Sequence, residues 1–161
     1  MSLYNSQIQW AWVVIVHHYI YGPYERNEVS WRNFCLYEWV HAKNIIIGGD
    51  LNFTLYDNEI WGSMKRLDRL VGFLQDKIED MGWVDVYPIK VNPTWSNNRI
   101  GRVGVYRWLD KFLIQHWLLD STLCFRSWLE SKCFLDHCPI FLELGLGGGD
   151  KANAPFKNNP Y

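Results

Sequence analysis

Two short segments place acidic, amide and imidazole side chains directly beside apolar runs. The segment IIIGGDLN ends an apolar run in two glycines and then presents Asp50 and Asn52. The segment LDHCPI places Asp136 beside His137, just before another apolar run. A carboxylate can take a proton from water, an amide can hydrogen-bond a phosphate oxygen, and imidazole titrates near neutral pH. Together these groups are typical of a site that cleaves phosphodiesters.

Both pairs also have a purely structural explanation. Asp50 and Asn52 are common turn residues that hydrogen-bond their own backbone, and an Asp beside a His is common in surface turns. Gly48 and Gly49 favour a functional interpretation, because glycines let a substrate approach and ligands bind at the carboxyl ends of strands in open α/β sheets. The spacing of the residues leaves both explanations open.

Asp110 lies inside the apolar run WLDKFLI. A carboxylate in such a run needs a buried partner, and a functional imidazole needs a group that orients one ring nitrogen. We therefore expect Asp110 to orient His137. The alternative is a salt bridge between Asp110 and a sequence neighbour, Arg107 or Lys111.

The elements that hold these residues are predicted to be mixed strands and helices. Residues 8–21, 44–48 and 105–114 are rich in β-branched, aromatic or other apolar residues and predict strands. Residues 65–81 carry apolar side chains at i, i+3 and i+4 and predict a helix that Gly82 ends. This pattern predicts α/β layers.

Length and composition fit one globular domain. The chain has 161 residues, of which 48% are hydrophobic and 20% charged, and its net charge of −1 excludes a strongly basic nucleic-acid binder. The longest apolar stretch is too short to cross a membrane, and no signal peptide is evident. The chain has four cysteines without a CxxC pair. We expect reduced thiols in an intracellular protein, with cytoplasm or nucleus left open.

Five motifs follow one another with gaps that fit one family. They are YIYGP at 19–23, GGDLN at 48–52, PTWSNNR at 93–99, LDKFLI at 109–114 and DHCPI at 136–140. In this order they resemble the endonuclease/exonuclease/phosphatase superfamily, and within it the endonuclease domain of plant LINE-type (non-LTR) retrotransposon polyproteins. Any one motif is weak, whereas five in order are a specific signal.

The resemblance implies an α/β fold of the DNase I-like type, a four-layer sandwich of mixed sheets flanked by helices. Residues 8–144 are then the carboxy-terminal part of such a domain, so the sandwich is partial. Residues 145–161 are rich in Gly, Asn and Pro and are expected to form a flexible, linker-like tail. An exposed sheet edge is expected to permit self-association.

The resemblance also implies roles for the residues of the first segments. Asp50 resembles the family's Asp that activates the attacking water. Asn52 resembles the Asn that positions the phosphate, and Tyr21 resembles the Tyr that hydrogen-bonds it. The implied substrate, and the expected partner, is DNA.

The implied roles of the later motifs concern charge and metal. His137 resembles the His that stabilises charge on the scissile phosphate, and Asp110 resembles the Asp that orients this His. Asp136 resembles the Asp near the metal ion. The implied cofactor is Mg²⁺, which prefers oxygen ligands and stabilises negative charge.

The chain departs from the family pattern at residues on which the family's activity depends. Only 20 residues precede Tyr21 and none is Glu or Asp. From the resemblance we therefore expect the strands that carry the family's Asn and main metal-binding Glu to be missing from this chain. Leu135 stands in place of a Ser, and Trp108 in place of an Arg, with Arg107 displaced by one. We therefore expect an impaired or inactive endonuclease. The alternatives are a noncatalytic structural or binding remnant and a small-molecule phosphatase of the same superfamily.

Overall fold

The fold centres on a five-stranded mixed sheet in the order β1-β2-β3-β8-β5. A computed structural model describes residues 3–10, 13–22, 28–37, 44–63, 65–119, 123–130 and 136–146. The strands of the central sheet are β1 (Leu3–Trp10), β2 (Val13–Ile20), β3 (Ile45–Asp50), β8 (Asp110–Gln115) and β5 (Trp83–Asp85). β2 and β3 are parallel, whereas β8 is antiparallel to both β3 and β5. β8 therefore has backbone partners on both sides.

Two smaller sheets and short helices accompany the central sheet. The smaller sheets consist of β9 (Leu123–Leu129) with β10 (Ile140–Leu146), and of β4 (Ile60–Gly62), β7 (Val105–Arg107) and β6 (Trp95–Ser96). The helices are α1 (Glu28–Cys35), α2 (Val71–Asp80) and α3 (His116–Leu119), with 3-10 turns η2 (Asp57–Glu59) and η3 (Gly101–Val103).

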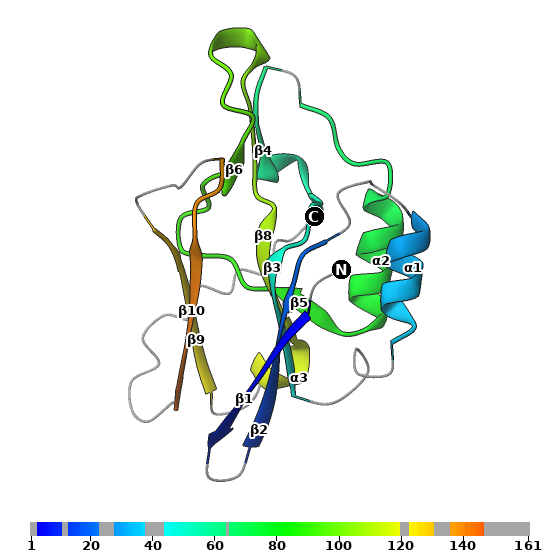
Figure 1. Ribbon diagram of the computed structural model, residues 1–161, viewed down its shortest axis with the longest axis vertical. Coiled ribbons are helices and arrows are strands. Elements are labelled where there is room, and N and C mark those ends of the chain that lie inside the picture. Colours follow the sequence, from blue (N-terminus) through cyan, green and yellow to red (C-terminus); the bar gives the residue numbers. More distant parts are fainter. Residues whose placement is uncertain are drawn as a thin grey trace.

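The central sheet is covered on both faces (Figure 1). Helices α1 and α2 lie on one face, where Trp31, Phe34 and Leu74 pack against Ile45 and other strand residues. β9 and β10 lie on the other face, over a second apolar cluster made of Ile46, Val86, Phe112, Ile114, Leu118 and Phe125. Because side chains alternate along a strand, successive residues of β3 contribute to opposite clusters, Ile45 and Ile47 to the first and Ile46 to the second. These layers confirm the predicted α/β architecture.

The amino-terminal strand prediction is wrong in its topology. Residues 8–21 do not form one strand, because β1 and β2 pair as an antiparallel hairpin in which Leu3 faces Ile20 and Trp10 faces Val13. β2 also pairs with β3, so it is an interior strand. A continuous apolar run suits such a position but does not reveal where the chain reverses.

Two other predicted elements are shorter than the apolar pattern suggested. The predicted strand over 105–114 divides into β7 and β8, because the Trp108 N–H donates to Glu59 O at 3.0 Å while Leu109 O accepts from the Leu51 N–H at 3.0 Å. The predicted helix over 65–81 begins only at Val71. The residues before it are held by contacts to distant parts of the chain, which local periodicity does not report.

The predicted domain boundaries at residues 8 and 144 stay predictions. Strand β1 begins at Leu3, and β10 ends at Leu146. Residues 147–161, most of the predicted tail, lie outside the described residues. Within the described residues β1 and β5 are the edges of the central sheet, and self-association through an edge stays a prediction. None of the helices in the described ranges is long and apolar enough to cross a membrane.

Gly49 allows β3 to approach its neighbour closely. Its φ is 137°, a conformation that other residues rarely adopt. A Cβ at this position would lie 2.1 Å from the carbonyl oxygen of Ile20. The glycine before Asp50 is therefore required by the backbone, independently of any ligand.

Replacing Gly49 tests this requirement. We expect Gly49→Ala to lower the free energy of unfolding by about 3 kcal/mol or more, because the Cβ meets backbone and the φ is strained. Gly72→Ala in α2 is a matched control with no atom within 4 Å of the added Cβ, and it should stabilise the protein by about 0.5–1 kcal/mol. Urea denaturation measures both. Equal midpoints for the two variants would contradict the required close approach.

Candidate active site

The register of β3 on β8 creates the site. The antiparallel pairing places Asp50 directly opposite Asp110. Since side chains alternate along a strand, Asp50 lies on the same face as Ile46, and Asp110 on the same face as Phe112, which is the face covered by β9 and β10. Two buried carboxylates are thus brought to adjacent positions, where like charges repel.

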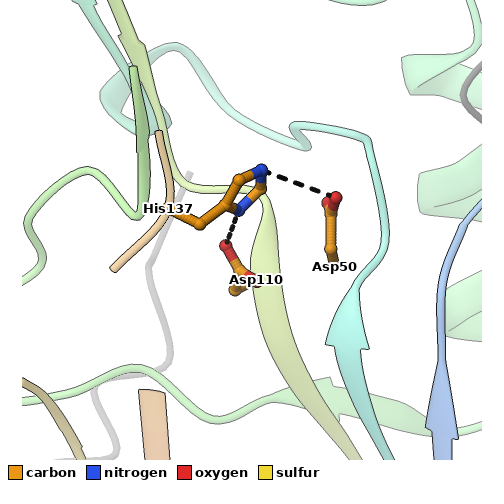
Figure 2. A group of neighbouring side chains, drawn as sticks. All are labelled: Asp50, Asp110 and His137. Atoms are coloured by element: carbon orange, nitrogen blue, oxygen red, sulfur yellow. Dashed lines mark hydrogen bonds and ion pairs between the residues drawn. The ribbon is translucent and has the colours of Figure 1, made fainter. Parts of the chain in front are cut away.

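His137 lies between these two carboxylates (Figure 2). Its Nδ1–H donates to Asp110 Oδ2 at 2.9 Å, and its Nε2 lies 3.8 Å from Asp50 Oδ2. Ligand atoms of the three residues all lie within 4.8 Å of one another. The His137 side chain is 32% exposed, so one side of the imidazole still reaches solvent. We call these three residues the acid–imidazole cluster.

The cluster shifts the pKa of two of its members upward. Burial raises the pKa of the Asp50 carboxyl, the charge of Asp110 raises it further, and a hydrogen bond from the Asn52 N–H opposes the rise. The hydrogen bond to Asp110 raises the pKa of His137 despite its partial desolvation, and the Asp50 charge adds to this rise. The arrangement therefore favours a proton on the imidazole between the two acids.

Asn52 connects the Asp50 loop to the segment that carries Tyr21. Its backbone N–H donates to Asp50 Oδ1 at 3.0 Å, and its Nδ2 donates to the Gly22 carbonyl at 3.1 Å. Asn52 has a φ of 56°, as Asn tolerates in turns. The local turn contact of the structural explanation is therefore present. Asp50 Oδ2, by contrast, is buried without a hydrogen-bond partner, so this oxygen is not used by the turn.

An open pocket of about 570 Å³ leads to the cluster. It is lined by Tyr21, Asp50, Asn52, Trp95, Asn97, Val105, Arg107, Leu109, Asp136 and His137. Among these residues, Tyr21 is 48% exposed. The structure thus brings Tyr21, Asp50, Asn52, Asp136 and His137 to one pocket and places Asp110 behind His137.

Asp136 takes a different position from the other acids. It is exposed, and its Oδ2 accepts a hydrogen bond from Trp95 Nε1 at 3.2 Å. It is not part of the acid–imidazole cluster. Its predicted place near a metal ion stays a prediction.

The sequence neighbours of Asp110 pair with other residues. Lys111 Nζ lies 2.8 Å from Glu59 Oε1, and Arg107 NH1 lies 3.5 Å from Asp68 Oδ1. The alternative of a salt bridge between Asp110 and either neighbour is therefore wrong. Lys111 follows Asp110 in β8 and points to the opposite face, whereas Arg107 belongs to another strand.

Arg107 and Thr94 were not predicted as site residues. Arg107 lines the pocket although it is displaced by one position from the Arg of the family that the motifs resemble. Thr94 is fully buried, and its hydroxyl accepts hydrogen bonds from the N–H groups of Leu109 and Asp110. Thr94 belongs to the motif PTWSNNR, so the sequence indicated this segment. It could not indicate which residues the threonine contacts.

One cysteine differs from the expectation of reduced thiols. Cys138, beside His137, is disulfide-bonded, whereas Cys35 and Cys124 are free. The expectation rested on the missing CxxC pair and secretory signal, neither of which fixes the distance between two thiols in the fold. The fourth cysteine, Cys133, lies outside the described residues.

Comparison with known proteins supports the fold. No protein-family model matches the sequence, and no curated protein matches it. The structure is similar to one described as "Endonuclease domain of TRAS1, a telomere-specific non-LTR retrotransposon", with a TM-score of 0.67 and 16% identity. The match covers 91% of this chain and 63% of that chain, so this chain spans less than two thirds of its length. The predicted DNase I-like fold class is confirmed.

Replacing Asp110 tests the electrostatics of the cluster. Because the hydrogen bond to the Asp110 carboxylate is the main cause of the raised His137 pKa, we expect that pKa to fall in Asp110→Asn. Asp136→Asn is the matched control and should have a smaller effect, since Asp136 contributes least of the three acids. NMR titration of the imidazole protons measures both variants. A His137 pKa that is unchanged in Asp110→Asn would refute this assignment.

The raised pKa of His137 also determines whether the free energy of unfolding rises or falls with pH. A pKa raised in the folded state means that His137 stabilises the fold fully below its unfolded-state pKa. This contribution is lost as the pH rises through the folded-state pKa. Asp110→Asn should therefore weaken the loss of stability that accompanies deprotonation of His137.

Proposed function

We propose that the pocket is an impaired endonuclease site, which accepts a DNA phosphodiester and hydrolyses it slowly because the chain binds Mg²⁺ weakly. The observation that carries this proposal is the acid–imidazole cluster, in which Asp50 lies opposite Asp110 and His137 lies between them, and of which Asp50 and His137 line the pocket. The similarity in fold to a retrotransposon endonuclease domain and the five motifs support a retroelement origin.

Asp50 is the proposed general base. Its Oδ2 is buried without a hydrogen-bond partner and its side chain lines the pocket. Burial and the neighbouring Asp110 raise its pKa, and a base whose pKa lies closer to the working pH takes a proton from water with a better driving force. A water molecule beside Oδ2 would lose its proton to this oxygen as it attacks phosphorus. The bond from phosphorus to the leaving sugar oxygen would break in the same step, and that oxygen would take a proton from solvent.

His137 is the proposed stabiliser of the charge that develops on the phosphate. Its Nδ1–H is held by Asp110, so the ring is oriented and Nε2 remains for the pocket. A protonated imidazole fixed in this way stabilises negative charge without reorganising during the reaction. Asn52 and Tyr21, which also line the pocket, are proposed to position phosphate oxygens.

The acid–imidazole cluster could hold a metal ion, but it offers Mg²⁺ few free oxygens. Mg²⁺ prefers oxygen ligands in octahedral geometry. In the cluster, Asp110 Oδ2 already accepts from His137 Nδ1–H, and an imidazole that carries both protons offers no lone pair to a metal. Within the described part of the chain no glutamate lines the pocket. We therefore expect the metal on which the family depends to bind weakly here.

The resemblance suggests the substrate class, and the net charge of the chain indicates how tightly that substrate binds. DNA is the proposed substrate, and a net charge of −1 implies low affinity for it, since affinity for DNA comes largely from neutralised phosphates. Slow turnover and weak binding are therefore expected together.

Nicking of supercoiled plasmid in the presence of Mg²⁺ tests this proposal. We expect slow nicking by the wild-type chain, and we expect Asp50→Asn and His137→Ala to reduce it by about a hundredfold or to background. Asp76→Asn, at an exposed position on α2, is the matched control and should nick like wild type.

Each other outcome contradicts part of the proposal. Nicking that survives in Asp50→Asn would show that the pocket is not the site. Rapid nicking at low Mg²⁺ would refute the impairment. Absence of nicking even at high Mg²⁺ would favour a noncatalytic remnant, and faster hydrolysis of a small phosphate monoester than of plasmid would favour a phosphatase.

A further inference from the structure

Thr94 lies between the two elements that carry Asp110 and His137. It directly precedes β6, is fully buried and does not line the pocket. Asp110 begins β8, whereas His137 comes from the turn before β10, and 27 positions separate them in the sequence. Some third segment must therefore set the distance between these two elements.

The side chain of Thr94 holds the start of β8. Its Oγ1 accepts from the Leu109 N–H at 2.9 Å and from the Asp110 N–H at 3.0 Å. A hydroxyl oxygen has two lone pairs, so these two bonds use its full capacity as an acceptor. The backbone of Asp110 is thereby fixed relative to Thr94.

The backbone of Thr94 holds the turn that carries His137. The Cys138 N–H donates to Thr94 O at 2.7 Å, and Trp95 forms an isolated β-bridge with His137. The Ser96 N–H donates to the Asp136 carbonyl at 2.9 Å. The residues on either side of His137 are therefore bonded to Thr94 and to the residues that follow it.

We propose that Thr94 is a positioning residue that sets the separation of Asp110 and His137 through its hydroxyl. A hydrogen bond weakens within a few tenths of an ångström of stretch, so the 2.9 Å contact between these residues depends on this separation. Only the predicted effect on cleavage rests on the proposed function. The effect on the Asp110–His137 hydrogen bond does not.

Two variants at Thr94 separate positioning from general stability. Thr94→Val keeps the shape of the side chain and removes both acceptor bonds, whereas Thr94→Ser keeps the oxygen and loses only the methyl group. Thr54→Val is a matched control, because Thr54 is equally buried and its hydroxyl bonds to Asp68. A role in stability alone would make the two valine variants behave alike at the active site.

The readout is the downfield proton resonance of His137 Nδ1–H, observed by NMR at fixed pH. We expect wild type, Thr94→Ser and Thr54→Val to show it, and Thr94→Val to lose it or move it upfield while the indole resonance of Trp83 persists as a sign of the fold. Should the valine variant not fold, Thr94→Ala takes its place, since its smaller side chain leaves room for water beside the two N–H groups. The same loss is expected there.

Kinetics supply a second readout wherever wild-type nicking is measurable. Thr94→Val should lower kcat by about tenfold or more and leave KM unchanged, because misplacement of a reacting group slows the reaction and Thr94 does not line the pocket. An unshifted His137 resonance in Thr94→Val or Thr94→Ala, or its loss in Thr94→Ser or Thr54→Val, would overturn the proposal. Failure of wild-type nicking would count against the proposed function and leave the NMR result to decide the role of Thr94.

Discussion

The site depends on the antiparallel register of β3 and β8, which sets Asp50 directly opposite Asp110. Two facing carboxylates repel, and burial removes the water that would screen them. The His137 imidazole between them offsets this repulsion when it is protonated, and its pKa is raised accordingly. The three groups are therefore interdependent, because the charges of neighbouring members shift the pKa values of Asp50 and His137.

β8 carries a second charged network on its opposite face. Lys111 is fully buried and contacts Glu59 Oε1 at 2.8 Å and Asp85 Oδ2 at 2.9 Å. Burial raises the pKa of Asp85 to about 6 although Lys111 opposes the rise. Glu59 also accepts from the Leu55 N–H at 2.6 Å, which fixes the loop that follows Asn52. Strand β8 thus positions the acid–imidazole cluster with one face. With its other face it positions the loop that follows Asn52.

Short sequence patterns predicted which side chains lie together better than they predicted the strand topology. Asp110 was predicted to orient His137 because a carboxylate in an apolar run needs a partner, and the structure places them 2.9 Å apart. The β1–β2 hairpin and the late start of α2 were missed, since both depend on pairing with distant residues. The hydrogen bonds from Thr54 to Asp68, at 3.0 and 3.1 Å, illustrate this limit, because they hold the segment before α2 outside the helix.

The central claim is that the acid–imidazole cluster binds Mg²⁺ weakly, because the raised pKa of His137 favours a proton on the imidazole. Metal binding to such a cluster would have to displace this proton from His137. The most direct test is an NMR titration with Mg²⁺ at fixed pH that follows the His137 imidazole resonances. We predict no saturable shift at low Mg²⁺ concentration. A saturable shift of these resonances, accompanied by release of a proton, would contradict the account.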